Sequence, residues 1–224
     1  AILWDIPEEE QEEYVTWYAE HYPGTLVTFP EAVSESDNVP WEYDIRDELA
    51  TNDDCPPPLE DGWWRRRLDQ IDGVTIHHTL SHDPFAVAER YVQKDGGRPS
   101  IPYTIWVTEE GYVILCNDLE DGVWHDHTGN RNTHLSVGLA GRWDNEHPSQ
   151  EQLKAAARVA AWAVRNPDMS VTRESVKGHQ DYIATACPGW QSGWRDDFYA
   201  LLDAELGIEP EPEPPTAWPD GPAT

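Results

Sequence analysis

Two short segments that lie far apart in the sequence both carry metal-binding side chains. The first, residues 75–79, ends a short apolar run and contains His77 and His78. The second, residues 178–189, holds His179 and Cys187, and a Pro-Gly turn directly follows the Cys. Two imidazoles and one thiolate are ligands of the kind that a catalytic zinc takes when its fourth position stays open for water. The implied chemistry is hydrolysis, and the fold must bring the two segments together.

The pattern between and after these segments predicts alternating strands and helices. We expect strands at residues 74–79 and 135–139, a hairpin formed by residues 101–108 and 112–116, and helices at 84–94, 149–164 and 191–206. Asp83 is the expected cap of the first helix, and Ser149 with Gln152 forms a capping box at the second. The predicted fold class is α/β, with a central mixed β-sheet flanked by helices.

The charge of the chain is strongly negative and unevenly spread. The formal net charge is −28, and residues 1–62 hold eighteen Asp or Glu against one basic residue, Arg46. A surface this acidic repels phosphate backbones. No nucleic-acid partner is therefore expected. No apolar run approaches the roughly 20 residues of a membrane span, and no basic segment followed by an apolar one opens the chain as a signal peptide would.

Composition divides the chain into three expected parts. Residues 1–62 form an acidic N-terminal arm or accessory subdomain, with one amphipathic helical stripe at Tyr14, Trp17, Tyr18 and His21. Residues 63–207 form the main domain, and residues 208–224 are a Pro/Glu-rich tail or linker. We expect removal of residues 1–55 to leave a folded core.

The order of several motifs resembles that of a known enzyme family. The motifs are Ile76-His77-His78-Thr79, Ile101-Pro102-Tyr103, Trp124-His125, Ser136-Val137-Gly138-Leu139, and Gly178-His179 with Cys187-Pro188-Gly189. They occur in the order seen in phage-type N-acetylmuramoyl-L-alanine amidases (amidase type 2), to which animal peptidoglycan-recognition proteins are similar. The resemblance spans roughly Trp63 to Leu206 and leaves the acidic N-terminal extension unexplained.

The resemblance implies a zinc site and an amidase reaction. Taken alone, a strand His is more often a hydrogen-bonded core residue and a Cys a small buried hydrophobe, but the order of motifs favours His77, His179 and Cys187 as Zn²⁺ ligands. Of the His pair, the first holds the family's ligand position, and alternation sends His78 to the opposite face. The implied substrate is bacterial peptidoglycan, cleaved at the amide between N-acetylmuramic acid and L-alanine.

The same resemblance assigns roles to further residues. Tyr103 is the expected catalytic phenol, and Thr185 a weaker donor to the developing oxyanion. Trp124, His125 and Asn130 are expected to contact substrate, with support of the metal site as the alternative for His125. The chain departs from the family at Thr104, where His is common, and at residues 139–141, which offer no acid where some related amidases place a Glu.

A second class of function stays open at this point, namely a non-catalytic peptidoglycan-binding recognition module. Such modules typically lose the ligand Cys or the Tyr, and this chain keeps both. An endolysin-like enzyme would act on the cell wall as a monomer, either secreted or phage-encoded and released at lysis. Cys55 and Cys116 are then free thiols or one optional pair.

Overall fold

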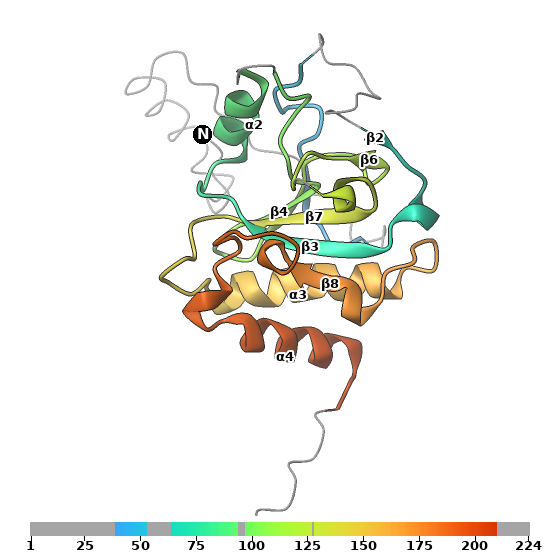
Figure 1. Ribbon diagram of the computed structural model, residues 1–224, viewed down its shortest axis with the longest axis vertical. Coiled ribbons are helices and arrows are strands. Elements are labelled where there is room, and N and C mark those ends of the chain that lie inside the picture. The colour runs from blue at the N-terminus through green and yellow to red at the C-terminus, as the bar shows by residue number, and fades with distance from the viewer. Residues whose placement is uncertain (1–38, 53–63, 94–96, 127, 210–224) are drawn as a thin grey trace, which may run out of the picture.

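A six-stranded mixed sheet forms the centre of the protein. The computed structural model describes residues 39–52, 64–93, 97–126 and 128–209 (Figure 1). The strand order is β1-β5-β4-β7-β3-β8, and β4 and β5 form an antiparallel hairpin while the other pairs are parallel. The strands are β1 Tyr43–Asp44, β3 Gly73–His78, β4 Ile105–Val107, β5 Val113–Leu115, β7 His134–Leu139 and β8 Val176–Gly178. A small antiparallel ribbon joins β2 Trp64–Arg65 to β6 Asp121–Gly122. The expected mixed sheet is confirmed.

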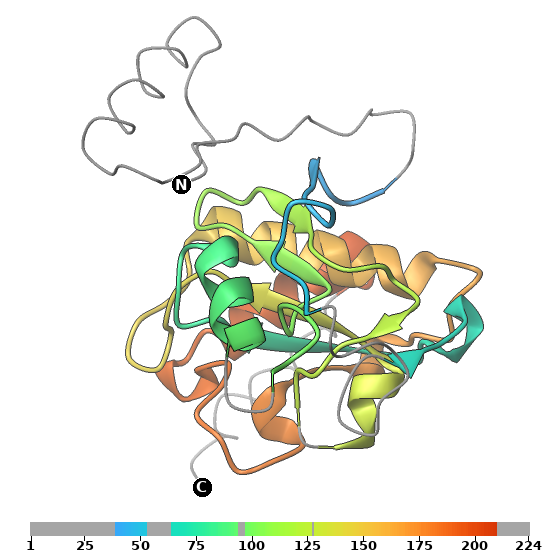
Figure 2. The same ribbon diagram turned by 90° about the horizontal axis from the view of Figure 1, so that it is seen from above.

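Helices cover both faces of the sheet (Figures 1 and 2). Helices α3 (Gln150–Arg165) and α4 (Arg195–Leu206) lie on one face, where Val74 and Ile76 of β3 join their core. Helix α2 (Pro84–Gln93) lies on the other face with a separate core that includes Tyr103 and Trp106. Because strand side chains alternate, Thr75 and His77 point to the face opposite Val74 and Ile76. Thr75 and His77 therefore lie on the α2 side of the sheet, and His78 lies on the other side.

The expected N-terminal caps of α2 and α3 are present, with one difference at α3. The carboxylate of Asp83 accepts the backbone N–H of Phe85 at 2.9 Å, and the hydroxyl of Ser149 accepts that of Gln152 at 3.0 Å. The return bond of the capping box is absent, because Oε1 of Gln152 has no hydrogen-bond partner in the described part of the chain, while Nε2 donates to the carbonyls of Val107 and Ala140. These bonds tie α3 to β4 and to the residue after β7. Helix α4 begins at Arg195, and a 3₁₀ turn at Trp190–Ser192 precedes it.

Part of the acidic N-terminal segment belongs to the sheet. Strand β1 pairs with β5, and the side chains of Ile45 and Leu49 are buried against the α2-side core. A truncation that removes residues 1–55 would delete this strand, so the cut that spares the sheet lies before residue 39. The amphipathic stripe expected at residues 14–21 and the tail from residue 210 lie outside the described residues. Within the described ranges, no helix combines the length and apolarity needed to cross a membrane.

Candidate metal centre and active site

Parallel strand pairing brings the two histidines of the predicted metal site together. Strand β3 runs parallel to β8, with Ile76 opposite Gly178, so His77 and His179 leave the same edge of the sheet. His179 opens the 3₁₀ turn η5 (His179–Asp181) directly after β8. The ring centroids of His77 and His179 are 4.6 Å apart. The two imidazoles therefore meet although a hundred residues of chain separate them.

Cys187 completes the cluster from the loop that follows η5. Its Sγ lies 3.5 Å from Nδ1 of His77 and accepts the backbone N–H of His78 at 3.4 Å. The ligand atoms of His77, His179 and Cys187 all lie within 4.8 Å of one another, and no other group of three such side chains occurs in the described part of the chain. Gly189 (φ +104°) permits this turn, because a Cβ there would lie 2.1 Å from the carbonyl oxygen of Trp143.

Burial sets the protonation of these groups. Desolvation, followed by the nearby imidazoles of His125 and His179, holds the pKa of His77 well below its usual range, so its imidazole is neutral. Burial raises the pKa of the Cys187 thiol to about 12. A neutral imidazole is the ligand form, whereas a ligand thiol gives up its proton when metal binds. Two imidazoles and one thiol at these separations fit a zinc-type ion.

Tyr103 lies beside the three candidate ligands. Its ring centroid is 5.8 Å from that of His77, and its hydroxyl donates to the carbonyl of His78 at 3.4 Å. Burial raises the pKa of Tyr103 well above its usual range, so the phenol keeps its proton and remains a donor. Thr185 is half-buried, and its hydroxyl accepts the backbone N–H of Cys187 at 3.2 Å.

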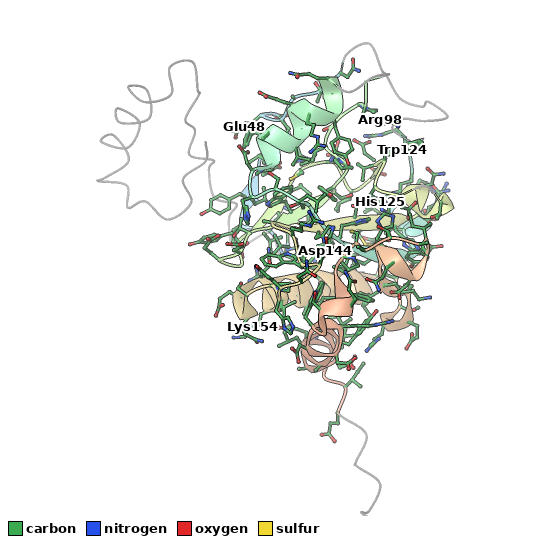
Figure 3. All side chains as sticks on the ribbon, turned by 60° about the vertical axis from the view of Figure 1, so that its left-hand side comes forward. Glu48, Arg98, Trp124, His125, Asp144 and Lys154 are labelled. Carbon is green, nitrogen blue, oxygen red and sulfur yellow. The ribbon has the colours of Figure 1, made fainter. Side chains whose placement is uncertain are left out.

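The side chains of His125 and Trp124 lie in different places, the first against the metal centre and the second nearer the surface. The side chain of His125 is buried, and its Nδ1 lies 3.0 Å from Nε2 of His77. Trp124 is half-buried, and the guanidinium of Arg98 lies 4.2 Å from its ring centroid. Figure 3 shows Arg98 and Trp124 together above His125. Asn130 belongs to the 3₁₀ turn η3 (Gly129–Asn132), which follows this loop.

Two acids lie near the site, of which Asp144 was not singled out from the sequence. Oδ1 of Asp144 lies 3.4 Å from Nδ1 of His78, and Oδ2 accepts the Nε–H of Arg142 at 2.7 Å. Asp126 directly follows His125 in the chain, and its Oδ2 lies 3.8 Å from Nδ1 of His125. Asp144 follows β7, whose carboxyl end belongs to the edge that carries His77, and this topological position is the signal that could have identified it. A carboxylate therefore lies near the site, although residues 139–141 supply none.

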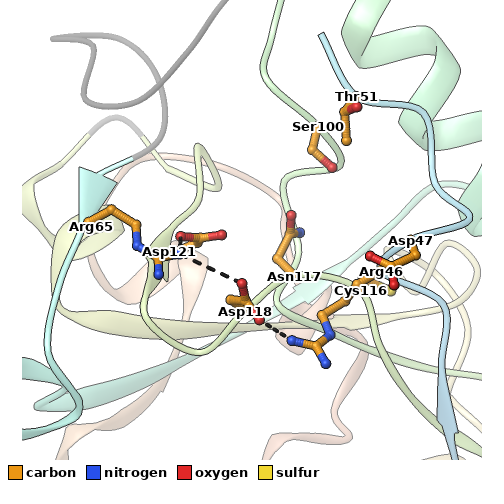
Figure 4. Close-up of a pocket in the computed structure, with 9 residues that line it drawn as sticks. All are labelled: Arg46, Asp47, Thr51, Arg65, Ser100, Cys116, Asn117, Asp118 and Asp121. Atoms are coloured by element: carbon orange, nitrogen blue, oxygen red, sulfur yellow. Dashed lines mark hydrogen bonds and ion pairs between the residues drawn. The ribbon is translucent and has the colours of Figure 1, made fainter. Parts of the chain in front are cut away.

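One hollow lined by charged residues is separate from this cluster. It measures about 520 Å³ and is lined by Arg46, Asp47, Thr51, Arg65, Ser100, Cys116, Asn117, Asp118 and Asp121 (Figure 4). Asp118 pairs with both Arg46 and Arg65, and Asp121 pairs with Arg65 at 2.6 Å. The two arginines that line the hollow are thus both paired with carboxylates of its wall. No residue of the metal cluster lines it.

Comparison with known proteins places the chain in a family. A model of the N-acetylmuramoyl-L-alanine amidase family matches residues 67–190, more than half of the chain, and this stretch contains His77, His179 and Cys187. The chain belongs to this amidase family. The amidase match covers every strand of the six-stranded sheet except β1. A search of curated proteins gave no match.

Solved structures of amidases and recognition proteins share the fold. The amidase LysC from Clostridium intestinale superimposes with a TM-score of 0.52 at 16% identity, covering 65% of this chain and 91% of that one. The Ph2119 endolysin of a Thermus scotoductus bacteriophage gives 0.52 at 16% identity, covering 66% and 92%. Peptidoglycan recognition protein-LE in complex with tracheal cytotoxin gives 0.55 at 17% identity, covering 72% and 91%. At these identities the similarity establishes the fold.

Proposed function

We propose that this amidase-family protein is a zinc-dependent peptidoglycan hydrolase that cleaves the amide between N-acetylmuramic acid and L-alanine. The observation that carries the proposal is the meeting of His77, His179 and Cys187 within 4.8 Å at one edge of the sheet. A cluster of this composition is the ligand set of a catalytic zinc with one open position. The proposed place of action is the bacterial cell wall, in the manner of the endolysins whose fold it shares.

His77, His179 and Cys187 would hold the ion. A zinc ion in this position supplies Lewis acidity toward the substrate carbonyl and lowers the pKa of a water nucleophile to about 7. Amide hydrolysis requires both, because the amide carbonyl is a poor electrophile and neutral water a weak nucleophile. The cleavage would leave the glycan chain intact.

Tyr103 is the proposed donor to the reacting carbonyl. Its phenol is protonated and lies beside His77, so its O–H is able to stabilise negative charge that develops on the carbonyl oxygen. In the present structure the hydroxyl donates weakly, at 3.4 Å, to the carbonyl of His78, a bond that substrate could displace. Thr185 is the proposed second donor, next to the turn that holds Cys187.

Trp124 and Asn130 are the proposed substrate contacts. Trp124 has an aromatic face half-open to solvent and stacked with Arg98, a combination that suits the apolar faces of sugars and the amides of a stem peptide. Asn130 would add amide hydrogen bonds from η3. For His125 the contact with His77 favours support of the metal site over substrate contact.

The rival function is a non-catalytic peptidoglycan-binding module, since the shared fold also includes a recognition protein in complex with a peptidoglycan fragment. The presence of both Cys187 and Tyr103 in the cluster favours the enzyme.

Digestion of purified cell wall separates the two functions. An N-acetylmuramoyl-L-alanine amidase releases new free amino groups of L-alanine without new reducing sugars, and elemental analysis should give one zinc per chain. Binding to cell wall without release of amino groups would support the recognition module, and release of reducing sugar would exclude the amidase reaction.

A further inference from the structure

A hydrogen bond behind the metal cluster links His77 to His125. The two nitrogens of the His77 ring face different partners: Nδ1 lies 3.5 Å from Sγ of Cys187, and Nε2 lies 3.0 Å from Nδ1 of His125. The ring planes of the two histidines are inclined at 78°, with centroids 5.1 Å apart. At 3.0 Å the nitrogens are at full hydrogen-bonding distance. One edge of His77 is therefore committed to the ligand cluster and the other to His125.

The ring nitrogen of His77 that carries the single proton determines which of the two histidines is the donor in this hydrogen bond. A neutral imidazole carries one N–H, and a nitrogen that faces a metal must offer its lone pair. Nδ1 is the nitrogen on the side of Cys187, so the proton belongs on Nε2. This N–H then points at Nδ1 of His125, which must be the acceptor.

Resting on the zinc site proposed above, we propose that His125 is a positioning residue of the metal centre. Its Nδ1 accepts the Nε2–H of His77, and this bond fixes both the tautomer and the rotation of the ligand ring. Hydrogen bonds of this kind to a ligand imidazole typically change metal affinity or activity by 10–100-fold when they are removed. The role differs from substrate contact, because the acceptor acts through His77 and needs no access to the substrate.

The surroundings of His125 hold the acceptor in place. The side chains of His125 and Asp126 have no exposed surface. The backbone N–H and the hydroxyl of Thr128 both donate to Oδ1 of Asp126, at 2.8 and 2.9 Å, which closes the loop directly after His125. Nε2 of His125 is buried and has no hydrogen-bond partner in the described part of the chain. Nδ1 of His125 lies 3.0 Å from His77 but 3.8 Å from Oδ2 of Asp126, so only the contact with His77 is at hydrogen-bonding distance.

Two measurements test the inference on the full-length protein. Long-range ¹H–¹⁵N correlation spectra of the zinc-loaded protein report the tautomers without any mutation. The expected result is His77 bound through Nδ1 with a proton on Nε2, and His125 without a proton on Nδ1. A metal bond through Nε2 of His77, or a proton on Nδ1 of His125, would overturn the inference.

Substitution supplies the second measurement, with His125→Asn and His125→Leu as a matched pair. Asn and Leu have nearly the same size, but only Asn offers an acceptor near the place of Nδ1. Competition with a chromophoric chelator should show zinc binding 10–100-fold weaker for His125→Leu than for the native protein, and His125→Asn should recover most of this loss. Equal affinities of the two variants would contradict the role. If the Leu variant does not fold, the tautomer spectra alone decide.

Failure of the proposed function gives a different result. If the native protein binds no zinc, the metal site itself is wrong and the inference falls with it. If native protein binds zinc and both variants bind it equally well, only the role of His125 is wrong.

Discussion

The ring of Tyr103 lies directly over Gly138, in a space that no other residue type would leave open. A Cβ built on Gly138 would lie 2.9 Å from Cγ of Tyr103 and 2.8 Å from Cγ2 of Thr79. Gly138 is opposite His77 in the parallel pair of β3 and β7. The glycine therefore makes room for the proposed catalytic phenol one strand away from the metal cluster.

Gly138→Ala should displace Tyr103 and destabilise the protein. Overpacking of a tight interior typically costs about 1–3 kcal/mol, and we expect cell-wall hydrolysis to fall more than zinc binding does. Thermal unfolding, zinc content and turnover measure the three effects. Gly129→Ala is the control, because no atom lies within 4 Å of its added Cβ. Native activity in Gly138→Ala would mean that the position of the phenol is not critical.

Tyr103→Phe should keep the fold and the metal but lose turnover. The change removes one hydroxyl and little volume, and loss of one donor to a developing oxyanion typically lowers the rate by about a hundred- to a thousandfold. Assays on purified muropeptides give the rate. Tyr199→Phe removes a hydroxyl that donates to Val176 at 2.8 Å, away from the cluster, and should keep its rate. Unchanged turnover of Tyr103→Phe would make Tyr103 a structural aromatic.

Cys187→Ser should abolish stoichiometric zinc, because a hydroxyl is a much poorer zinc ligand than a thiolate. Cys116→Ala is the matched control, since Cys116 is also a buried free thiol but lies outside the ligand cluster. It should lose some stability and keep one zinc per chain. Elemental analysis after dialysis decides, and full zinc in Cys187→Ser would exclude this thiol as a ligand.

Two truncations should behave differently. Removal of residues 1–38 should leave a folded domain, whereas removal of residues 1–52 also deletes β1 with Ile45 and Leu49. Full burial of two such side chains contributes roughly 3–6 kcal/mol, and their loss would expose the core that contacts α2. Unfolding by urea measures the difference. Equal stability of the two truncated chains would show that β1 adds nothing to the domain.

Stability should fall as the pH drops below about 6.5, the usual pKa of histidine in an unfolded chain. Burial lowers the pKa of His134 in the folded protein, against the opposing effects of Asp72 and Asp126. In this range the unfolded chain binds more protons than the folded one, so acid favours unfolding, and the full stability is present only above the unfolded pKa. Urea titrations of zinc-free protein from pH 8 to 5 should show a smaller slope for His134→Gln than for a variant at the exposed His82. Equal slopes would assign the acid sensitivity to other groups.

The sequence predicted the sheet well because its elements carry strong local signals. The alternation of Val74, Thr75, Ile76 and His77 and the Asp83 and Ser149 caps each specify an element and one of its ends. The predicted return bond to Gln152 was wrong, since its side-chain amide is held by the carbonyls of Val107 and Ala140, which are distant in sequence. Strand β1 was also missed, because two residues in an acidic segment give no periodicity of their own.

The ligand cluster, too, could be predicted better than the residues around it. The three candidate ligands were implied by the order of motifs that the chain shares with the amidase family, whereas the partners of those ligands depend on contacts between distant loops. The pairing of His78 with Asp144 could not be predicted, because the pair has no fixed sequence separation. Support of the metal site by His125 was one of two alternatives, and the sequence did not indicate that its partner is His77.

The alternating faces of β3 couple its register to its chemistry. Sliding this strand by one residue against β7 and β8 would turn His77 into the apolar layer that contacts α3 and would turn Ile76 toward the ligand cluster. Two independent penalties oppose the same error: an imidazole buried without a partner, and an isoleucine in place of the imidazole that the cluster needs. A metal ion bound at His77, His179 and Cys187 would add a third, since it recognises only the correctly registered strand. A chromogenic ion such as cobalt would then report, during refolding, the moment at which β3 and β8 reach their native alignment.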